Sequence, residues 1–428
     1  MIIRHGSCCR ESPIFNNMRL RYKIWKPAVA VILIIVSVSS CKKDNLTNNY
    51  NYYVSKESSV SYTMDYVNTL LSAASITMPE FTNLKSFVTS GVNCYKVVYK
   101  TTVDGQDIDA SGLVCVPSDP GEYPVLSFQN GTNTVNSLAP TEAPSSYTYQ
   151  MIEMVASMGY VVVIADYPGF GESSQIPHPY LIKEPTVQSL VDLLFAVKEM
   201  TSDDLPGITL KNDYSLIGYS QGGWATLALD NAIETDYSND FNLTGSVCGA
   251  GPYDLSLLFT GMVSHLTYPM PVFVCYIVNA YSAYHQFTNP VTDILNQPYA
   301  DKLSTLYDGT LSLDQINSQL NDTLSVLLNP DFISGYTSSN NYASVREALA
   351  SNSVPAWQTT KPLLLIHGEA DSTVSPVSTT TMYNDMLQAG TSPDLLEKIM
   401  IPNVGHSDGV VPAMTQGILY LLNLRNKR

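Results

Sequence analysis

The chain has 428 residues, of which 45% are hydrophobic and 14% are charged, so it is long enough to bury the core of one large domain or of two. Its net charge of −16 excludes the basic surface with which proteins bind nucleic acids. We therefore expect a globular protein that does not recognise DNA or RNA.

The first 40 residues have the features of a secretory signal peptide. Basic residues between Arg19 and Lys26 precede the apolar run AVAVILIIVSV, which is too short to span a bilayer. The run ends in VSSC, which resembles the lipobox of bacterial lipoproteins and implies a lipid on Cys41. We predict a signal peptide over residues 1–40, with Met18 as the more natural start, and a protein anchored in a bacterial cell envelope. An ordinary signal peptide with a chance cysteine is the alternative.

A tether and a hairpin come next. Residues 41–57 are rich in asparagine and tyrosine without periodicity, which predicts a tether. The segments CYKVVYKTTV and IDASGLVCVP, separated at Asp104-Gly105, predict two antiparallel strands. They carry Cys94 and Cys115, which are either a cross-strand disulfide or buried free thiols.

Strands and helices then alternate along the chain. Apolar runs predict strands at residues 124–128, 160–165, 214–218, 243–250, 362–366 and 398–401. Helices are predicted at residues 147–158, 184–200, after 220, and 410–424. An antiparallel start followed by β-α-β units predicts an α/β fold, with a mostly parallel open sheet and helices on both faces.

A segment of about 100 residues breaks this rhythm. Residues 253–358 mix helical and loop composition, with proline, tyrosine and asparagine throughout. We predict an inserted, largely helical cap over the C-terminal edge of the sheet, where ligands of such folds bind. The core is then divided into residues 58–252 and 359–428.

One serine stands at a strand-to-helix junction, in the sequence SLIGYSQGG. Ser220 can act as a nucleophile there if a histidine accepts its proton and an acid orients that histidine. Asp371 follows the predicted strand PLLLI, and His406 follows the last predicted strand. All three therefore lie on loops at the C-terminal ends of strands of one sheet, where they can converge.

Other residues compete for these roles. Asp254 is a rival acid, but it is better placed as the N-cap of the first cap helix. Asp408 is too close to His406 along the chain to be its partner. His367 ends a strand, where we expect it to bond the backbone rather than to take part in catalysis.

The motifs resemble a known fold and a known family. GYSQGG resembles the G-x-S-x-G elbow of the α/β-hydrolase fold, whose chain order is also Ser, Asp, His. The stretch ADYPGFGESSQIPHPYL resembles the D-Y-x-G-x-G…H-P-Y stretch of secretory lipases of the yeast lipase A type and their bacterial relatives. The resemblance covers roughly residues 90–425. It implies a serine hydrolase of carboxylic esters, with an acyl-enzyme on Ser220, His406 as base and Asp371 as the orienting acid, and no metal or organic cofactor.

The resemblance also implies an oxyanion hole of two backbone donors. One is the amide of Gln221, and the other lies in FQNGTNT, where Gly131 and Thr132 are the candidates. Relatives commonly carry His-Gly where this chain has Asn130-Gly131, so a role of that histidine does not carry over. The DYPGFG segment is expected to be a turn beside the pocket, since its glycine spacing and the missing lysine do not fit a phosphate loop.

The elbow does not define the substrate, because specificity depends on the cap and the pocket. A peptidase or a carbohydrate esterase with the same triad is therefore an alternative to a lipase-like esterase. A non-catalytic binding lipoprotein on a decayed hydrolase fold is a third hypothesis, disfavoured because all three triad positions are filled. The predicted partners are a small-molecule ester and, through Cys41, the membrane.

Overall fold

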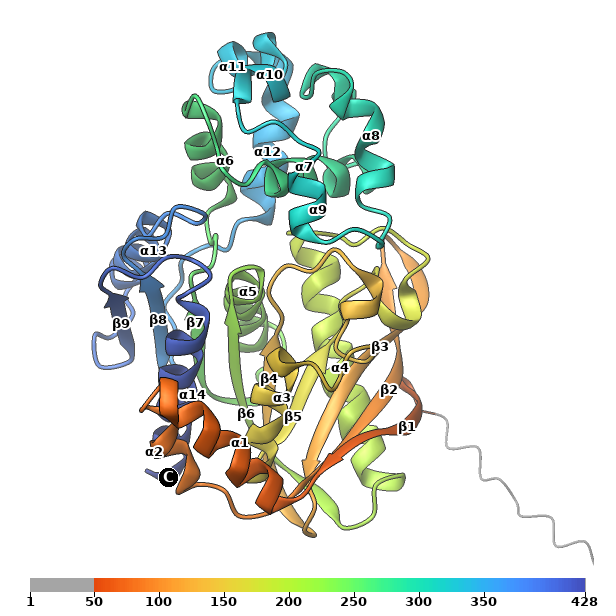
Figure 1. Cartoon of the computed structure of the whole chain (residues 1–428), viewed down its shortest axis with the longest axis vertical. Coiled ribbons are helices and arrows are strands. Elements are labelled where there is room, and N and C mark those ends of the chain that lie inside the picture. Colours follow the sequence, from red (N-terminus) through yellow and green to blue (C-terminus); the bar gives the residue numbers. More distant parts are fainter. Residues whose placement is uncertain (1–49, 428) are drawn as a thin grey trace, which may run out of the picture. The chain divides into compact units, whose positions relative to one another are not determined.

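A computed structural model describes residues 50–427. The predicted signal peptide, Cys41 and most of the predicted tether lie outside the described residues. The strands are β1 (Tyr53–Tyr62), β2 (Val92–Val103), β3 (Gln106–Pro117), β4 (Gly121–Gln129), β5 (Val161–Ala165), β6 (Ile208–Tyr219), β7 (Asn242–Gly249), β8 (Leu363–Gly368) and β9 (Leu396–Ile401). They form one nine-stranded sheet in the order β1-β2-β3-β5-β4-β6-β7-β8-β9 (Figure 1).

The sheet has the mixed arrangement expected from the sequence. The pairs β1–β2, β2–β3 and β3–β5 are antiparallel, and the remaining neighbours are parallel. Helices cover both faces: α1 (Met64–Thr77), α2 (Phe81–Lys85), α3 (Tyr147–Glu153) and α14 (Val410–Asn426) on one, and α4 (Lys183–Asp203), α5 (Gln221–Thr235) and α13 (Val377–Gln388) on the other. The predicted fold class, an α/β-hydrolase-type sheet between two helical layers, is confirmed.

The predicted tether is wrong at its C-terminal end. Residues from Tyr53 onward form β1, which pairs with β2 at the edge of the sheet. Where the strand begins, the amides of Asn51, Tyr52 and Tyr53 all donate to the carboxylate of Glu199 on α4, at 2.7–3.0 Å. The sequence did not predict this strand because β1 is an edge strand whose side chains are mostly exposed, so it lacks a clear apolar alternation. The core therefore begins before residue 58.

The predicted hairpin is present, and its turn explains its register. Asp104 and Gly105 have φ values of 51° and 70°, the left-handed conformation that a two-residue hairpin turn needs. The pairing runs from Val103 opposite Gln106 back to Cys94 opposite Cys115. Both cysteines are buried free thiols.

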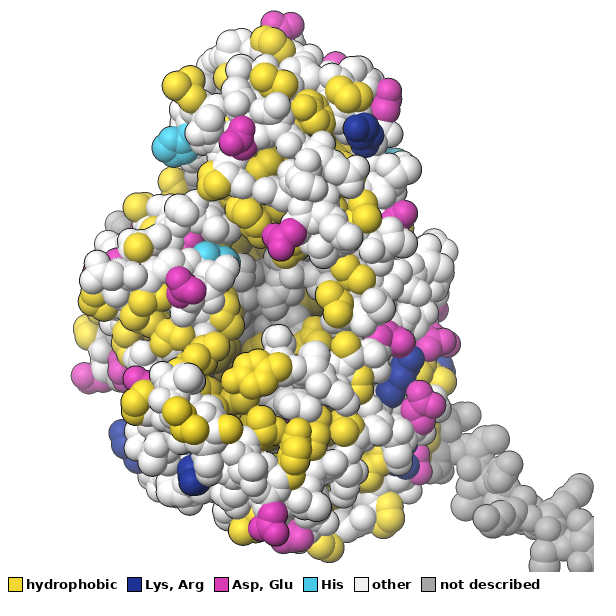
Figure 2. All heavy atoms as spheres, viewed as in Figure 1, with side chains coloured by type: hydrophobic (Ala, Val, Ile, Leu, Met, Phe, Trp, Pro, Cys, Tyr) yellow, Lys and Arg dark blue, Asp and Glu magenta, His cyan; other side chains and the backbone are white. Residues whose placement is uncertain are grey.

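Residues between β7 and β8 form helices that stand apart from the sheet. They are α6 (Leu255–Ser264), α7 (Pro271–Ala283), α8 (Tyr299–Leu306), α9 (Leu313–Asn317), α10 (Leu324–Leu327), α11 (Pro330–Gly335) and α12 (Ala343–Asn352). Figure 1 shows them gathered together beyond the sheet and its flanking helices. Figure 2 shows a hollow between these helices and the core on one face of the molecule, with hydrophobic side chains along part of its rim. The site described below lies where this cap meets the core.

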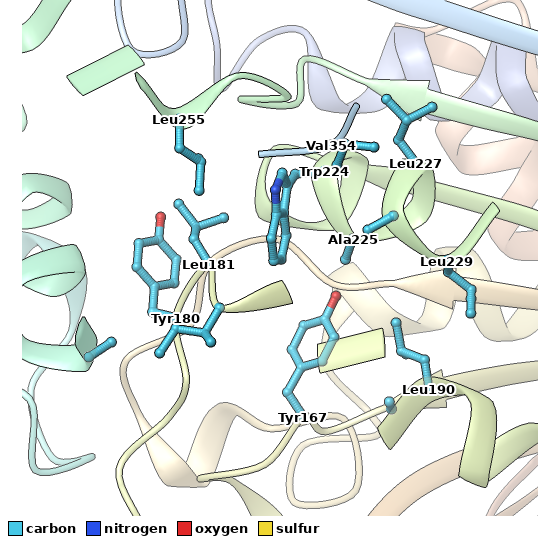
Figure 3. Packing of buried hydrophobic residues seen from close by; sticks show 14 of the residues in the cluster. Tyr167, Tyr180, Leu181, Leu190, Trp224, Ala225, Leu227, Leu229, Leu255 and Val354 are labelled. Atoms are coloured by element: carbon cyan, nitrogen blue, oxygen red, sulfur yellow. The ribbon is translucent and has the colours of Figure 1, made fainter. Parts of the chain in front are cut away.

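Trp224 joins the helix after the elbow to the base of the cap. It is fully buried on α5 and lies among Leu181, Leu255 and Val354 in Figure 3. Its indole Nε1–H donates to the Asn352 carbonyl at the end of α12, at 3.1 Å. The cap is thus packed onto the same helix that begins beside Ser220. Within residues 50–427, none of the helices combines the length and the apolar character that a bilayer-spanning segment needs.

A buried acid on α5 predicts how stability depends on pH. Burial raises the pKa of Asp230 to about 8, whereas an unfolded aspartate titrates near about 3.9. Between these values the folded state holds one more proton than the unfolded state, so the contribution of Asp230 to stability falls as pH rises from about 3.9, and the loss is complete above about 8. We expect Asp230→Asn to raise the free energy of unfolding more at pH 8.5 than at pH 5, by about 2 kcal/mol or more. Urea unfolding at both pH values measures this difference. The exposed Asp236→Asn variant is the control, and an equal effect of Asp230→Asn at both pH values would contradict the prediction.

Candidate active site

The site begins at the turn between β6 and α5. Ser220 follows the last residue of β6 and has φ 60° and ψ −122°, which a non-glycine residue adopts only when its surroundings enforce it. A Cβ on Gly218 would lie 2.4 Å from the Gly222 carbonyl oxygen, and one on Gly222 would lie 2.0 Å from the Gln129 carbonyl oxygen. The two glycines therefore let the turn close tightly and leave the Ser220 hydroxyl at the strand end.

The three residues predicted from the strand-end rule lie together. Ser220 Oγ is 2.8 Å from His406 Nε2, and His406 Nδ1 is 2.6 Å from Asp371 Oδ2. A carboxylate accepts hydrogen bonds, so Nδ1 carries the proton and Nε2 is left to accept the hydroxyl proton of Ser220. Tyr219 fixes the histidine loop, since its hydroxyl donates to the His406 carbonyl at 2.8 Å. The arrangement can activate Ser220 as a nucleophile.

Asp371 is held in its charged form. Its Oδ1 accepts from the amides of Thr373 and Val374, both at 2.8 Å. Burial alone would raise the pKa of Asp371, but hydrogen bonds from His367, His406 and the Val374 amide hold that pKa well below its usual range. An anion beside His406 favours the imidazolium that forms when Ser220 loses its proton.

His367 has a closer relation to the site than the sequence predicts. It is buried at the end of β8, and its Nε2 lies 3.1 Å from Asp371 Oδ2 and 3.0 Å from the Val374 carbonyl oxygen. Both partners only accept, so Nε2 carries the proton, and Nδ1 accepts from the Thr379 hydroxyl at 2.7 Å. His367 is therefore a second donor to the carboxylate. The spacing His-x-x-x-Asp at a strand end was the signal for this contact.

The loop predicted to complete an oxyanion hole lies against the start of α5. Gly222 on this helix is so close to the Gln129 carbonyl oxygen that a Cβ would lie 2.0 Å from it. Gly131 is exposed, whereas the hydroxyl of Thr132 lies 3.1 Å from that of Tyr180. The Asn130 side chain is buried and donates to the Ala165 carbonyl at 2.6 Å, across the end of β5. This hydrogen bond therefore links the C-terminal ends of β4 and β5.

The competing acids lie elsewhere. Asp254 is the N-cap of α6 and accepts from the Leu257 amide at 3.0 Å, so the predicted N-cap is confirmed. Asp408 is exposed. Neither has a hydrogen bond to His406 among the described residues.

One group in the described part of the chain could hold a metal ion. Cys94, Cys115 and Glu153 are buried, and their ligand atoms lie within 4.8 Å of one another. Glu153 also accepts from the Tyr62 hydroxyl at 2.7 Å, and burial raises its pKa to about 7. Burial raises the pKa of the Cys115 thiol as well, so the group favours protonated side chains over metal ligands. None of these residues belongs to the loops that carry Ser220, Asp371 and His406.

A small cavity opens beside Ser220. Its volume is about 20 Å³. Its walls are mostly apolar and come from both the core and the cap: Tyr180, Leu181, Ser220, Gln221, Pro252, Leu258, Met262, Tyr268, Phe273, Ile277, Thr373 and Val374. The Tyr268 hydroxyl donates to the Thr373 carbonyl at 3.2 Å, which joins the cap to the loop of Asp371.

The comparison that identifies the family rests on the sequence. A family model described as secretory lipase matches residues 142–406, more than half of the chain and a range that contains all three residues of the site. The chain belongs to the secretory lipase family. It is accordingly a hydrolase of the lipase and esterase type, and the resemblance read from the sequence is confirmed. The loop at 130–132 lies outside the residues that the family model matches.

Solved structures share the fold of this chain. A protein from Legionella pneumophila has a TM-score of 0.77 at 22% identity, covering 87% of this chain and 98% of its own. The rice cell wall degrading esterase LipA from Xanthomonas oryzae has a TM-score of 0.74 at 24% identity, covering 87% and 97%. Candida antarctica lipase A in its closed state has a TM-score of 0.66 at 15% identity, covering 88% and 82%. Among curated proteins, none matches the sequence significantly.

Proposed function

We propose that the protein hydrolyses carboxylic esters by nucleophilic catalysis at Ser220. The observation that carries the proposal is the unbroken chain from Ser220 Oγ through His406 to Asp371 Oδ2, with links of 2.8 and 2.6 Å. His406 Nε2 takes the hydroxyl proton while the oxygen of Ser220 attacks the ester carbonyl. The alcohol leaves with that proton, and water then attacks the acyl-enzyme with His406 again as base.

The intermediate needs donors for its negative oxygen. The Gln221 amide is the first donor of α5, where the helix dipole also favours negative charge. We assign the second donor to the backbone of Gly131 or Thr132, because their loop lies against the same turn of α5. Each such donor contributes about 10²–10³ in rate.

Labelling by a fluorophosphonate probe tests this mechanism, since the probe reacts only with an activated serine. We expect a single adduct on Ser220, blocked by prior denaturation, together with hydrolysis of p-nitrophenyl acetate. Comparison with the matching p-nitroanilide separates an esterase from a peptidase on the same residues. A folded protein that neither reacts with the probe nor cleaves the ester is a binding protein, and the proposal is then wrong.

The cavity predicts a preference for short acyl chains. The space beside Ser220 is narrow, about 20 Å³, and its walls are mostly apolar, so it favours small acyl groups. We expect kcat/KM to fall about 10-fold or more between the acetate and the hexanoate of a p-nitrophenyl series, because each excess methylene must displace the wall.

The wall residue Ile277 on α7 supplies the matched test of this preference. Ile277→Ala should shift the preference toward butyrate and hexanoate. Val278→Ala removes similar volume from the same helix without lining the cavity, so it should leave the preference unchanged. A wild-type protein that prefers decanoate or longer would contradict the prediction.

We also propose that the protein is a lipoprotein of a bacterial envelope, bound to the membrane through Cys41. The family is one of secretory enzymes, and the basic segment, apolar run and VSSC of the sequence support a lipid on this cysteine. Cells fed a labelled fatty acid should incorporate it into the wild type and not into Cys41→Ser, which should leave the membrane fraction. Equal labelling of both forms would contradict a lipid on Cys41.

A further inference from the structure

The segment Asp166–Tyr180, after β5, contacts the oxyanion region through three buried side chains. The Tyr167 hydroxyl donates to the Asn130 carbonyl at 3.2 Å. The Tyr180 hydroxyl lies 3.1 Å from that of Thr132. His178 Nε2 lies 2.8 Å from Gln221 Nε2. The sequence predicts only a turn beside the pocket for DYPGFG. In the structure, this segment and the residues up to Tyr180 contact both backbone segments that we propose bind the oxyanion.

The hydrogen bonds of His178 determine its tautomer. Its Nδ1 lies 2.8 Å from the Pro168 carbonyl oxygen, which only accepts, so Nδ1 carries the proton. Its Nε2 then accepts from the side-chain amide of Gln221. Burial lowers the pKa of His178 to about 4, so this tautomer persists at neutral pH. The other side-chain atom, Gln221 Oε1, is buried without a partner in the described part of the chain.

The surrounding loop fixes the imidazole in place. Gly169 has φ 93°, and a Cβ there would lie 2.5 Å from His178 Cα, so the turn packs directly on the histidine backbone. Its amide donates to Ser173 Oγ at 3.1 Å. The ring centroids of Phe170 and Tyr276 lie 4.9 and 5.9 Å from that of His178. The imidazole is therefore held by covalent and packing constraints independent of Gln221.

We propose that His178 is a positioning residue that fixes Gln221, and with it the backbone N–H that stabilises the oxyanion. This inference rests on the proposed function of Ser220 and Gln221. Gln221 is the first residue of α5, and the peptide that carries its N–H is held within the helix by one hydrogen bond, from the Trp224 amide to the Ser220 carbonyl at 3.1 Å. Anchoring its side chain restricts rotation of that peptide, and preorganised donors are what an oxyanion hole requires. The contact with His178 therefore adds a restraint on the Gln221 side chain to the one that the helix supplies on the backbone.

Kinetics of three variants test the inference. His178→Phe keeps an aromatic ring but removes both ring nitrogens. Gln221→Met keeps the backbone N–H but removes the side-chain amide. We expect His178→Phe and Gln221→Met each to lower kcat for p-nitrophenyl acetate about 10- to 100-fold with KM changed less than about twofold, since the donor acts in the transition state. The inhibition constant of a short alkylboronic acid, which forms a tetrahedral adduct, should weaken by the same factor. Tyr284→Phe is the matched control, because it removes a hydrogen bond to Pro177 in the same loop and should leave kcat unchanged.

The double variant decides between positioning and general support of the fold. If His178 acts through Gln221, His178→Phe should leave kcat nearly unchanged when it is introduced into the Gln221→Met variant. Additive losses, or a folded His178→Phe with wild-type kcat and boronate affinity, overturn the inference. If His178→Phe does not fold, a folded Gln221→Met with wild-type kcat overturns it by itself. Failure of the proposed function is seen separately, as a wild type without esterase activity.

Discussion

Replacement of Ser220 by alanine is expected to lower kcat for p-nitrophenyl acetate by about 10⁶-fold, with a residual rate from substrate binding and the oxyanion donors. The variant loses only one hydroxyl, and alanine is no less compatible with the tight turn than serine. The thermal midpoint should therefore stay close to that of the wild type. Stopped assays at high enzyme concentration, with the residual rate compared against buffer, measure the effect.

The control for Ser220→Ala is another serine-to-alanine change at an exposed position of the cap, Ser264. It should leave kcat unchanged. Retention of more than a tenth of the wild-type activity by Ser220→Ala would show that another group attacks the ester. The variant should also lose the fluorophosphonate adduct, so chemistry and kinetics give two independent readings.

Much of the fold was predictable because its local signals agree with one another. Asp104-Gly105 marks a two-residue hairpin, and continuous apolar runs such as Tyr160–Ala165 mark strands buried on both faces. β1 was missed because an edge strand with one weakly apolar face has the composition of a loop. α13 was missed because its sequence VSTTTMYNDMLQ is rich in threonine and has little helical propensity, so packing on β8 and β9 decides its structure.

The site was predictable where topology alone brings residues together. Ser220, Asp371 and His406 follow three strands of one sheet, and carboxyl ends of parallel strands share an edge. The contacts of His367 and His178 depend instead on how a loop folds back on a strand end. No spacing rule predicts that His178 lies beside Gln221, because the two come from different loops and meet only in the packed structure.

Asp371→Asn is expected to lower kcat by about 10⁴-fold at neutral pH, through a change of tautomer rather than a loss of structure. Oδ1 of Asp371 accepts from the backbone amides of Thr373 and Val374, which cannot reverse their polarity. The single oxygen of an asparagine must therefore face those amides. Its NH₂ group then faces His406, where the carboxylate of the wild type accepts.

The consequence falls on the proton of His406. An NH₂ donor opposite Nδ1 requires Nδ1 to accept, which moves the ring proton to Nε2, where it blocks transfer from Ser220. The same NH₂ opposes the Nε2–H of His367, so a lower thermal midpoint is also expected. Asp254→Asn is the matched control: it tests the rival acid, keeps an oxygen that can cap α6, and should leave both stability and kcat nearly unchanged. The opposite result would contradict the prediction: Asp254→Asn abolishes activity, while kcat of Asp371→Asn stays within about tenfold of the wild type. In that case Asp254 orients His406, and Asp371 only links His367 to the loop of Thr373 and Val374.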